Sequence, residues 1–205
     1  MSTRRPRRIA LTGGIATGKS YVRARFESLG VPTSDADLFA RAAVAPGSPG
    51  LAAVVRAFGP GVLDPSGALD RKAVADIVFR DPARRKTLEE IIHPIVRRAT
   101  EDWYARLDPA VPFAIFDIPL LYESGRDADF EAVIVVACAP ETQIRRVMER
   151  DHLSEVEARQ RLAAQLPIEE KVRRADYVVR TDGTFEQTDR QVKEIYGKLR
   201  GQRSA

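Results

Sequence analysis

The segment that most constrains this chain is Gly13-Gly-Ile-Ala-Thr-Gly-Lys-Ser20, which fits the pattern G-x-x-x-x-G-K-[ST]. Glycines let the backbone curl so that successive N–H groups point into one concavity of phosphate size. The apolar run from Ile9 to Thr12 before it is typical of a buried parallel strand, and the apolar spacing after Lys19 is typical of a helix. The motif therefore predicts a nucleotide phosphate site at the positive N-terminal end of a helix.

The residues of this loop have separate expected tasks. Lys19 is expected to reach the β- and γ-phosphates, and the Ser20 hydroxyl is expected to bind Mg²⁺. The residues expected to contact the nucleotide are those of the loop and the residue after it: Gly13, Gly14, Ile15, Ala16, Thr17, Gly18, Lys19, Ser20 and Tyr21.

Three aspartates follow predicted strands, at the sheet edge where α/β folds bind ligands. Asp35 and Asp37 follow the strand 31–34, and only one of them is expected to face the phosphates, because residues i and i+2 point apart. From the residues alone, Asp37 is either a base for a phosphoryl acceptor or the N-cap of the next helix. Asp117 ends the strand 113–116 and is expected to be a second Mg²⁺ ligand, with a strand-end turn as the alternative.

Two predicted helices carry further candidate residues. Arg146 and Arg150 lie four positions apart, so they form either a solvated charged face or a pair of cations that close over a transferring phosphate. His93 precedes Pro94 on an otherwise apolar helix surface, and its residue type favours a hydrogen-bonded structural histidine. Pro94 is expected to kink or break that helix.

The order of the elements predicts an α/β fold with a mainly parallel sheet. Strand signals recur at 9–12, 31–34, 113–118, 132–137 and 177–179, with helical patterns between them. Asp70, Asp81 and the capping box Ser154-Glu-Val-Glu157 mark three helix starts. The stretch from about 46 to 110 has little strand signal and predicts a helical insertion.

Composition and charge exclude several classes of protein. The 44% hydrophobic and 30% charged fractions are those of an ordinary globular domain. The single Cys138 cannot form an internal disulfide, which predicts a reducing compartment and hence the cytoplasm. The chain has no apolar run of 18 residues, so no membrane association is expected.

The net charge of +4 comes from the N-terminal tail. Arg4, Arg5, Arg7 and Arg8 account for it, and the rest of the chain has 29 basic against 29 acidic residues. Because a nucleic-acid-binding domain carries its basic excess on the folded body, no nucleic-acid partner is expected. The chain also contains no asparagine, which excludes the N-K-x-D guanine motif of a GTPase switch.

From one end to the other, the chain resembles the dephospho-CoA kinase family, whose members catalyse the last step of coenzyme A biosynthesis. The segments that carry the resemblance are Leu11-Thr-Gly-Gly-Ile-Ala-Thr-Gly-Lys-Ser20, Asp35-Ala-Asp37 with Ala40-Arg41, Ile92-His-Pro-Ile95, Asp117-Ile-Pro-Leu-Leu-Tyr-Glu123, Arg146-Val-Met-Glu-Arg150, Gln165, Glu170-Lys171 and Ala175-Asp-Tyr-Val-Val179. A kinase of a nucleoside monophosphate or small metabolite is the alternative, but it would not require Ile92-His-Pro or the segment Pro119-Leu-Leu-Tyr-Glu123.

The resemblance implies a P-loop kinase fold with a five-stranded sheet, an inserted helical substrate domain and a helical lid. Its implied boundaries are a core of about 7–45, 111–140 and 175–200, an insertion of about 46–110 and a lid of about 141–174. The implied reaction is transfer of a phosphoryl group from ATP, with Mg²⁺, to the 3′-hydroxyl of dephospho-CoA. A monomer or a weak oligomer is expected.

The resemblance also implies roles for individual residues. Asp37, Lys19 and Arg146 correspond to catalytic groups, and Arg150 to a second lid arginine on the nucleotide. The positions implied for the acceptor are Asp35, Arg41, His93, Leu121, Tyr122 and Glu123.

Three positions depart from the family pattern. Ala16 replaces a glycine that is usual in the loop, a change that the backbone tolerates if φ is negative. Tyr122 stands where phenylalanine is commoner, which keeps the ring. Arg180-Thr-Asp-Gly183 replaces an asparagine-containing turn near the adenine, and Asp182 can still turn the chain.

Overall fold

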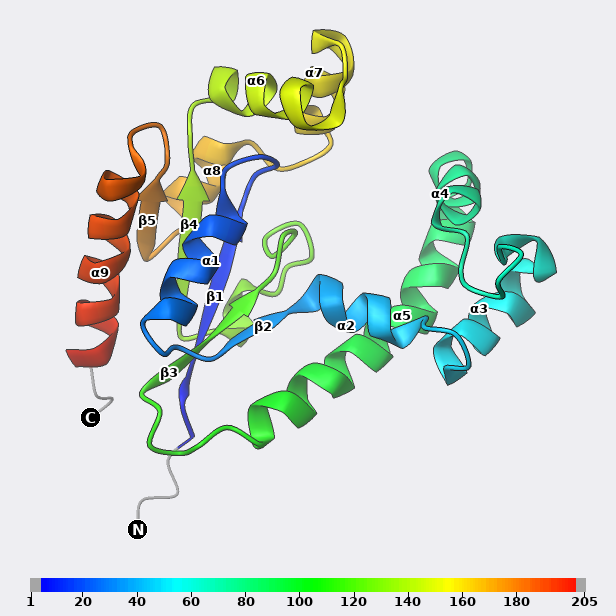
Figure 1. The fold of residues 1–205 in the computed structure, drawn as a ribbon, viewed down its shortest axis with the longest axis horizontal. Helices are drawn as coiled ribbons and strands as arrows, with labels where there is room; N and C mark the ends of the chain where they lie inside the picture. Colours follow the sequence, from blue (N-terminus) through cyan, green and yellow to red (C-terminus); the bar gives the residue numbers. More distant parts are fainter. Residues whose placement is uncertain (1–4, 202–205) are drawn as a thin grey trace. The chain divides into compact units, whose positions relative to one another are not determined.

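The computed structural model describes residues 5–201, so Arg4 of the basic tail lies outside the described residues. Its centre is a five-stranded parallel sheet in the order β2-β3-β1-β4-β5 (Figure 1). The strands are β1 (Arg7–Gly13), β2 (Thr33–Asp35), β3 (Phe113–Asp117), β4 (Ala132–Ala137) and β5 (Tyr177–Arg180). The α/β fold class and the positions of all five expected strands are thus confirmed, with differences of a few residues at their ends.

Helices connect and follow these strands. They are α1 (Lys19–Ser28), α2 (Ala36–Ala43), α3 (Pro49–Phe58), α4 (Arg71–Arg80), α5 (Pro82–Ala105), α6 (Pro140–Asp151), α7 (Glu155–Ala163), α8 (Ile168–Arg173) and α9 (Phe185–Gly201), with 3₁₀ turns at Pro60–Val62 and Asp127–Asp129. The short α8 is an element that the sequence pattern did not indicate. Among the described residues, no helix combines the length and the apolar character that crossing a bilayer requires.

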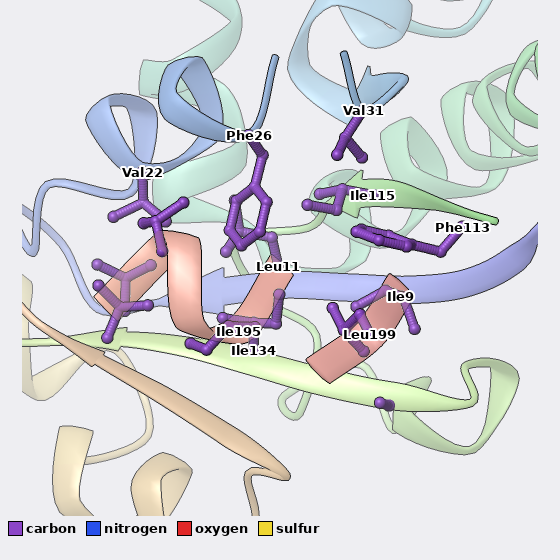
Figure 2. Close-up of a cluster of buried hydrophobic side chains, with 14 residues drawn as sticks. Ile9, Leu11, Val22, Phe26, Val31, Phe113, Ile115, Ile134, Ile195 and Leu199 are labelled. Carbon is purple, nitrogen blue, oxygen red and sulfur yellow. The ribbon is translucent and has the colours of Figure 1, made fainter. Parts of the chain in front are cut away.

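Both faces of the sheet are buried, as continuous apolar strands require. On one face, Ile9 and Leu11 pack with Phe26 of α1 and Leu199 of α9, as Figure 2 shows. Their neighbour Ala10 points to the opposite face, where Ile168 of α8 belongs to the cluster. Because side chains alternate along a strand, β1 is held from both sides, and the loop at its end starts from a rigid base.

The chain divides into two compact units. One contains the residues up to Ser34 and those from Leu107 onward, and therefore the sheet, α1 and α6 to α9. The other is Asp35–Arg106, which contains α2 to α5 around a small apolar core that includes Val54, Val62 and Val74. Helix α2, which the sequence analysis left with the core, belongs to this second unit.

The expected helix starts are confirmed, and at Pro94, where a kink or a break was expected, the helix is not broken. Asp70 and Asp81 accept hydrogen bonds from the first-turn amides of α4 and α5, and the capping box of Ser154 and Glu157 opens α7. Helix α5 continues through Pro94 to Ala105. A single proline costs a helix about 3 kcal/mol, and packing of the apolar side chains of α5 against the core of this unit offsets that cost.

Candidate active site

The phosphate loop has the predicted place, between β1 and α1. A side chain at Gly13 would meet the Val136 carbonyl oxygen at 2.6 Å, so no larger residue fits there. Gly18, at the N-terminal end of α1, has φ of +83°, a left-handed conformation that glycine adopts without strain. The loop therefore needs these two glycines for different reasons, close packing in one case and backbone geometry in the other.

Ala16 is the one loop residue whose expected geometry is wrong. Its φ is +58°, in the left-handed region, whereas the sequence analysis required a negative value. Its carbonyl oxygen accepts a hydrogen bond from Arg146 Nη1 at 3.3 Å, and it packs against the Ile144–Val147–Ala158 cluster of α6 and α7. These contacts hold a conformation that costs about 1–2 kcal/mol for a residue with a Cβ.

Lys19 and Asp117 form an ion pair beside the loop. The Asp117 carboxylate is 3% exposed, ends β3 as predicted, and also lies 3.6 Å from Arg23 Nη1. Because this carboxylate is surrounded by two cations, its negative charge is stabilised at the sheet edge. Lys19 is therefore held at the start of α1, close to the loop whose phosphate it is expected to bind.

Two glutamine side chains form hydrogen bonds with the backbone at the tip of the loop. Neither of them was assigned a role in the sequence analysis. Gln143 Nε2 of α6 donates to the Ile15 carbonyl oxygen at 2.7 Å. Ile15 N–H donates to Gln165 Oε1 at 2.9 Å. Gln165 belongs to the segments that carry the family resemblance, but Gln143 had no signal in the sequence. The N–H and the carbonyl oxygen of Ile15 are thus both hydrogen-bonded to side chains of the predicted lid.

The turn after β5 also supports the loop. The Thr181 hydroxyl donates to the Thr17 carbonyl oxygen at 2.7 Å, and Arg146 Nη2 donates to the Thr181 carbonyl oxygen at 2.8 Å. Asp182 accepts from Ala139 N–H at 2.7 Å, so it fastens this turn to the end of β4. The turn that departs from the family pattern therefore keeps a structural role without asparagine.

The two lid arginines lie in different surroundings. Arg146 is half-buried against the loop and the Thr181 turn, so it is not part of a merely solvated face. Arg150 is exposed and donates to both oxygens of Asp151, a bond that raises the pKa of Arg150. In this structure Arg146 is beside the loop, and the nucleotide contact of Arg150 stays a prediction.

Tyr21 follows the loop on α1. Its hydroxyl donates to Asp189 at 2.8 Å, and its ring lies 4.7 Å from that of Phe185, between ring centres. The Phe185 side chain is 67% exposed. Tyr21 is therefore fixed against α9, and its contact with a nucleotide remains a prediction. Ser20, the expected Mg²⁺ ligand, is exposed on the first turn of the same helix.

In the second unit, the structure separates the two neighbouring aspartates. Asp35 is the N-cap of α2, because its carboxylate accepts from Asp37 N–H at 2.8 Å and Leu38 N–H at 3.3 Å. The alternative that Asp37 caps this helix is therefore wrong. Asp37 lies in the first helical turn with an exposed side chain, so it is available to a reacting group.

Arg41 and His93 are also in the second unit, on α2 and α5, and both are exposed. The exposed His93 ring makes no hydrogen bond to another described residue, so the structure gives no support for a structural role of this histidine. Contact of either side chain with an acceptor stays a prediction.

Two residues of the segment after β3, which was expected to bind the acceptor, lie inside the protein. Leu121 is fully buried and Tyr122 is 5% exposed, both in the apolar core under the sheet. Burial raises the pKa of Tyr122 to about 12, although the Arg174 guanidinium over its ring opposes this shift. These two side chains therefore contact the core in this structure.

Glu123 pairs with a lysine that sequence reasoning gave no role. Lys171 Nζ of α8 is fully buried, 2.8 Å from Glu123 Oε1 and 3.3 Å from the Gly13 carbonyl oxygen. Burial alone would raise the pKa of Glu123, but the hydrogen bonds from Lys171 and Leu166 N–H outweigh it and lower the pKa. Lys171 was visible in the sequence only as part of a family segment.

The donor set at the loop fits Mg²⁺ bound together with phosphates. Mg²⁺ usually keeps several waters and takes one or two carboxylates plus phosphate oxygens. Ser20 and Asp117 offer one hydroxyl and one carboxylate, which is sufficient for that mode. Within residues 5–201, no group of three or more histidine, cysteine or acidic side chains could hold a metal by protein ligands alone.

Comparisons with known proteins agree with this geometry. A family model described as dephospho-CoA kinase matches residues 7–187. A dephospho-CoA kinase of Anaeromyxobacter dehalogenans is 50% identical and covers 95% of this chain and 93% of its own length. One from Geobacter sulfurreducens is 48% identical over 93% of this chain and 97% of its own.

Solved structures give the same result. A Thermus thermophilus structure matches with a TM-score of 0.84 and 38% identity, covering 96% of this chain and 99% of that one. The dephospho-CoA kinase from Campylobacter jejuni matches with a TM-score of 0.71 and 28% identity, over 95% and 97% of the two chains. A family model over most of the chain and relatives near half identity over nearly all of it lead to one conclusion: this chain belongs to the dephospho-CoA kinase family.

Proposed function

We propose that this enzyme transfers the γ-phosphoryl group of ATP to the 3′-hydroxyl of dephospho-CoA, with Lys19, Asp37 and Arg146 as its catalytic residues. The observation that carries the proposal is the phosphate loop between β1 and α1, which holds Lys19 against Asp117 in a chain of this family. A fixed cation beside a phosphate loop is suited to stabilise charge that develops during phosphoryl transfer.

The chain's own residues divide the chemistry among them. Lys19 binds oxygens of the transferred phosphoryl group, and the half-buried Arg146 adds a second positive charge beside the loop. Asp37 accepts the proton of the acceptor hydroxyl, which its exposed carboxylate can do without having to leave a cap hydrogen bond. Arg41 and His93 are proposed to bind the acceptor.

Ser20 and Asp117 are the residues that would hold Mg²⁺. When bound, the ion would neutralise phosphate charge and orient the phosphates for in-line attack. Asp117 already pairs with Lys19, so the same carboxylate would align the lysine and the ion.

The proposal also covers the oligomeric state, the partners and the cellular location of the enzyme. We expect a monomer or a weak oligomer with no nucleic-acid partner. We also propose a cytoplasmic location, because a lone, buried Cys138 suits a reducing compartment.

An ADP-release assay over a panel of acceptors tests the proposed reaction. Dephospho-CoA, AMP, CMP and adenosine would each be supplied with ATP and Mg²⁺ at equal concentration. We expect turnover with dephospho-CoA to exceed turnover with the other three by 100-fold or more, since a site that binds the whole acceptor uses that binding energy in the transition state, on the order of 3 kcal/mol. Faster turnover with AMP or CMP would instead identify a nucleoside monophosphate kinase.

A further inference from the structure

Two side chains of the predicted lid, one on α6 and one on α8, each donate a hydrogen bond to a carbonyl oxygen of the phosphate loop. Lys171 Nζ donates to the Gly13 oxygen at 3.3 Å, and Gln143 Nε2 donates to the Ile15 oxygen at 2.7 Å. Figure 1 shows α6 and α8 beside the loop that follows β1. These contacts join residues more than a hundred positions apart in the chain.

A held carbonyl fixes the direction of the next amide. The peptide unit is planar and trans, so its C=O and the N–H of the following residue point in opposite directions. The Gly13 carbonyl therefore sets the direction of Gly14 N–H, and the Ile15 carbonyl sets that of Ala16 N–H. Neither amide donates a hydrogen bond to another residue of the described chain.

Both anchoring side chains are buried, which makes the contacts specific. Lys171 is fully buried and Gln143 is 4% exposed, so neither can exchange its partner for water without moving. A buried ammonium is stable only with partners, and the described partners of Lys171 are Glu123 and the Gly13 oxygen. The fit at Gln143 is close, because a Cβ on Gly14 would meet its Nε2 at 2.4 Å.

From these contacts we infer that Lys171 and Gln143 are positioning residues of the phosphate loop, which keep Gly14 N–H and Ala16 N–H turned toward the bound phosphates. This inference rests on the proposed function for the identity of the ligand. Amides that are already oriented bind an anion without the cost of ordering a flexible loop. Neither Lys171 nor Gln143 needs to contact the phosphates.

The test measures binding of tripolyphosphate and of ATP by calorimetry, with no acceptor present. Gln143→Leu removes the Ile15 contact. Its matched control is Gln191→Leu, because the Gln191 side chain also forms hydrogen bonds with the backbone of another residue. It donates to the Arg180 carbonyl oxygen at 2.8 Å and accepts from Arg180 N–H at 2.8 Å. Each variant loses the hydrogen bonds of a glutamine side chain to the backbone. Only Gln143 contacts the phosphate loop.

Lys171 is replaced together with Glu123, so that the Lys171 variant does not leave the Glu123 carboxylate without its partner. Lys171→Met/Glu123→Gln removes both charges. Glu123→Gln alone retains the Lys171 ammonium, which can still donate to the Gly13 oxygen and to the amide oxygen of the new glutamine. We expect Gln143→Leu and the double variant to weaken tripolyphosphate binding about five-fold or more, the scale of one hydrogen bond. Gln191→Leu and Glu123→Gln should stay within about two-fold of the wild type, on the same scale.

Unchanged tripolyphosphate affinity in Gln143→Leu and in the double variant would overturn the inference. So would an equal loss in Gln191→Leu, since that result would indicate general loss of stability. Thermal unfolding of each variant identifies any that does not fold. If one variant fails to fold, the comparison of the other variant with its own control tests the inference. The acceptor panel tests the proposed reaction separately: a wild type that binds tripolyphosphate but ignores dephospho-CoA would contradict the proposed function and leave this inference standing.

Discussion

At the scale of single residues, the Lys19–Asp117 pair is expected to affect both the turnover and the stability of the enzyme. Replacing Lys19 by Ala should lower turnover by about 100-fold or more, because one lost contact to developing phosphate charge costs about 3 kcal/mol. Steady-state ADP release and circular dichroism, measured on the same sample, check this expectation.

The pair also affects how that variant folds. The nearly buried Asp117 keeps Arg23 at 3.6 Å after Lys19 is removed, so we expect a folded protein with a lower melting temperature. Asp117→Asn in the same background provides a control that restores charge balance. Turnover close to wild type in folded Lys19→Ala would remove Lys19 from the proposed mechanism.

Asp37 is expected to have a chemical role and Asp35 a structural one, so variants of the two residues should differ in their effects. Asp37→Asn removes the exposed carboxylate and should lower kcat by about 100-fold, the usual scale for loss of a general base, with little change in the melting temperature. Asp35→Ala removes the N-cap of α2 and should reduce the free energy of unfolding by about 1 kcal/mol. Rapid-quench kinetics and urea titration measure the two effects.

The capping geometry also predicts the effect of the milder substitution. Asp35→Asn should keep most of the stability, since asparagine caps as well as aspartate. If Asp37→Asn retained its kcat while Asp35→Asn abolished it, the base would be Asp35.

Ala16 stores backbone strain that glycine would relieve. Ala16→Gly removes about 1–2 kcal/mol of left-handed strain, but a more flexible unfolded chain offsets about 0.4–1 kcal/mol of this gain. We expect a free energy of unfolding that is higher by up to about 1.6 kcal/mol on these magnitudes, measured by urea titration. A loss of stability would mean that the methyl group's contacts with the cluster of α6 and α7 outweigh the strain.

At the scale of elements, α6 and α7 should respond to ligand through the loop. Gln143, Arg146 and Gln165 connect this predicted lid to Ile15 and Ala16, so stabilising the loop should also stabilise the lid. We expect hydrogen exchange across residues 141–166 to slow when a non-hydrolysable ATP analogue and dephospho-CoA are both bound. The amides of residues 192–201 in α9 serve as the control.

An unchanged exchange rate across 141–166 at saturation would contradict a closing lid. It would also mean that Arg150 remains a surface cation paired with Asp151 in the complex.

At the scale of the whole molecule, the Lys171–Glu123 pair, in which only the lysine is fully buried, should make stability depend on pH. The folded pKa of Glu123 lies below its ordinary value of 4.5, so its contribution is present above pH 4.5 and is lost as pH falls through the folded pKa. Glu123→Gln should therefore be less stable than the wild type at pH 7, by about 1–3 kcal/mol for a hydrogen bond to a charged group. Because Glu123 is partly exposed, the lower half of that range is expected.

Urea titrations at pH 7, 5 and 3.5 measure this difference. The gap between the wild type and Glu123→Gln should narrow as the pH falls. A gap of constant size would show that the Glu123 charge does not contribute, and that the loss at pH 7 comes from packing alone.

The sequence by itself determined the local features of this protein. The five strands, the phosphate loop before α1 and the caps at Asp70, Asp81 and Ser154 were all predicted, because each depends on residues within a few positions of one another. Strand and cap preferences are properties of the nearby backbone, so a pattern in the sequence can express them.

Only the tertiary structure decided which distant residues support the loop. Gln143, Lys171 and Thr181 each bind its backbone from more than a hundred residues away, and no local pattern marks such a contact. Tertiary contacts likewise hold Ala16 at positive φ and carry α5 through Pro94, where local preference argued otherwise. A local preference is worth about 1–3 kcal/mol, and packing and hydrogen bonds from distant parts of the chain can outweigh it.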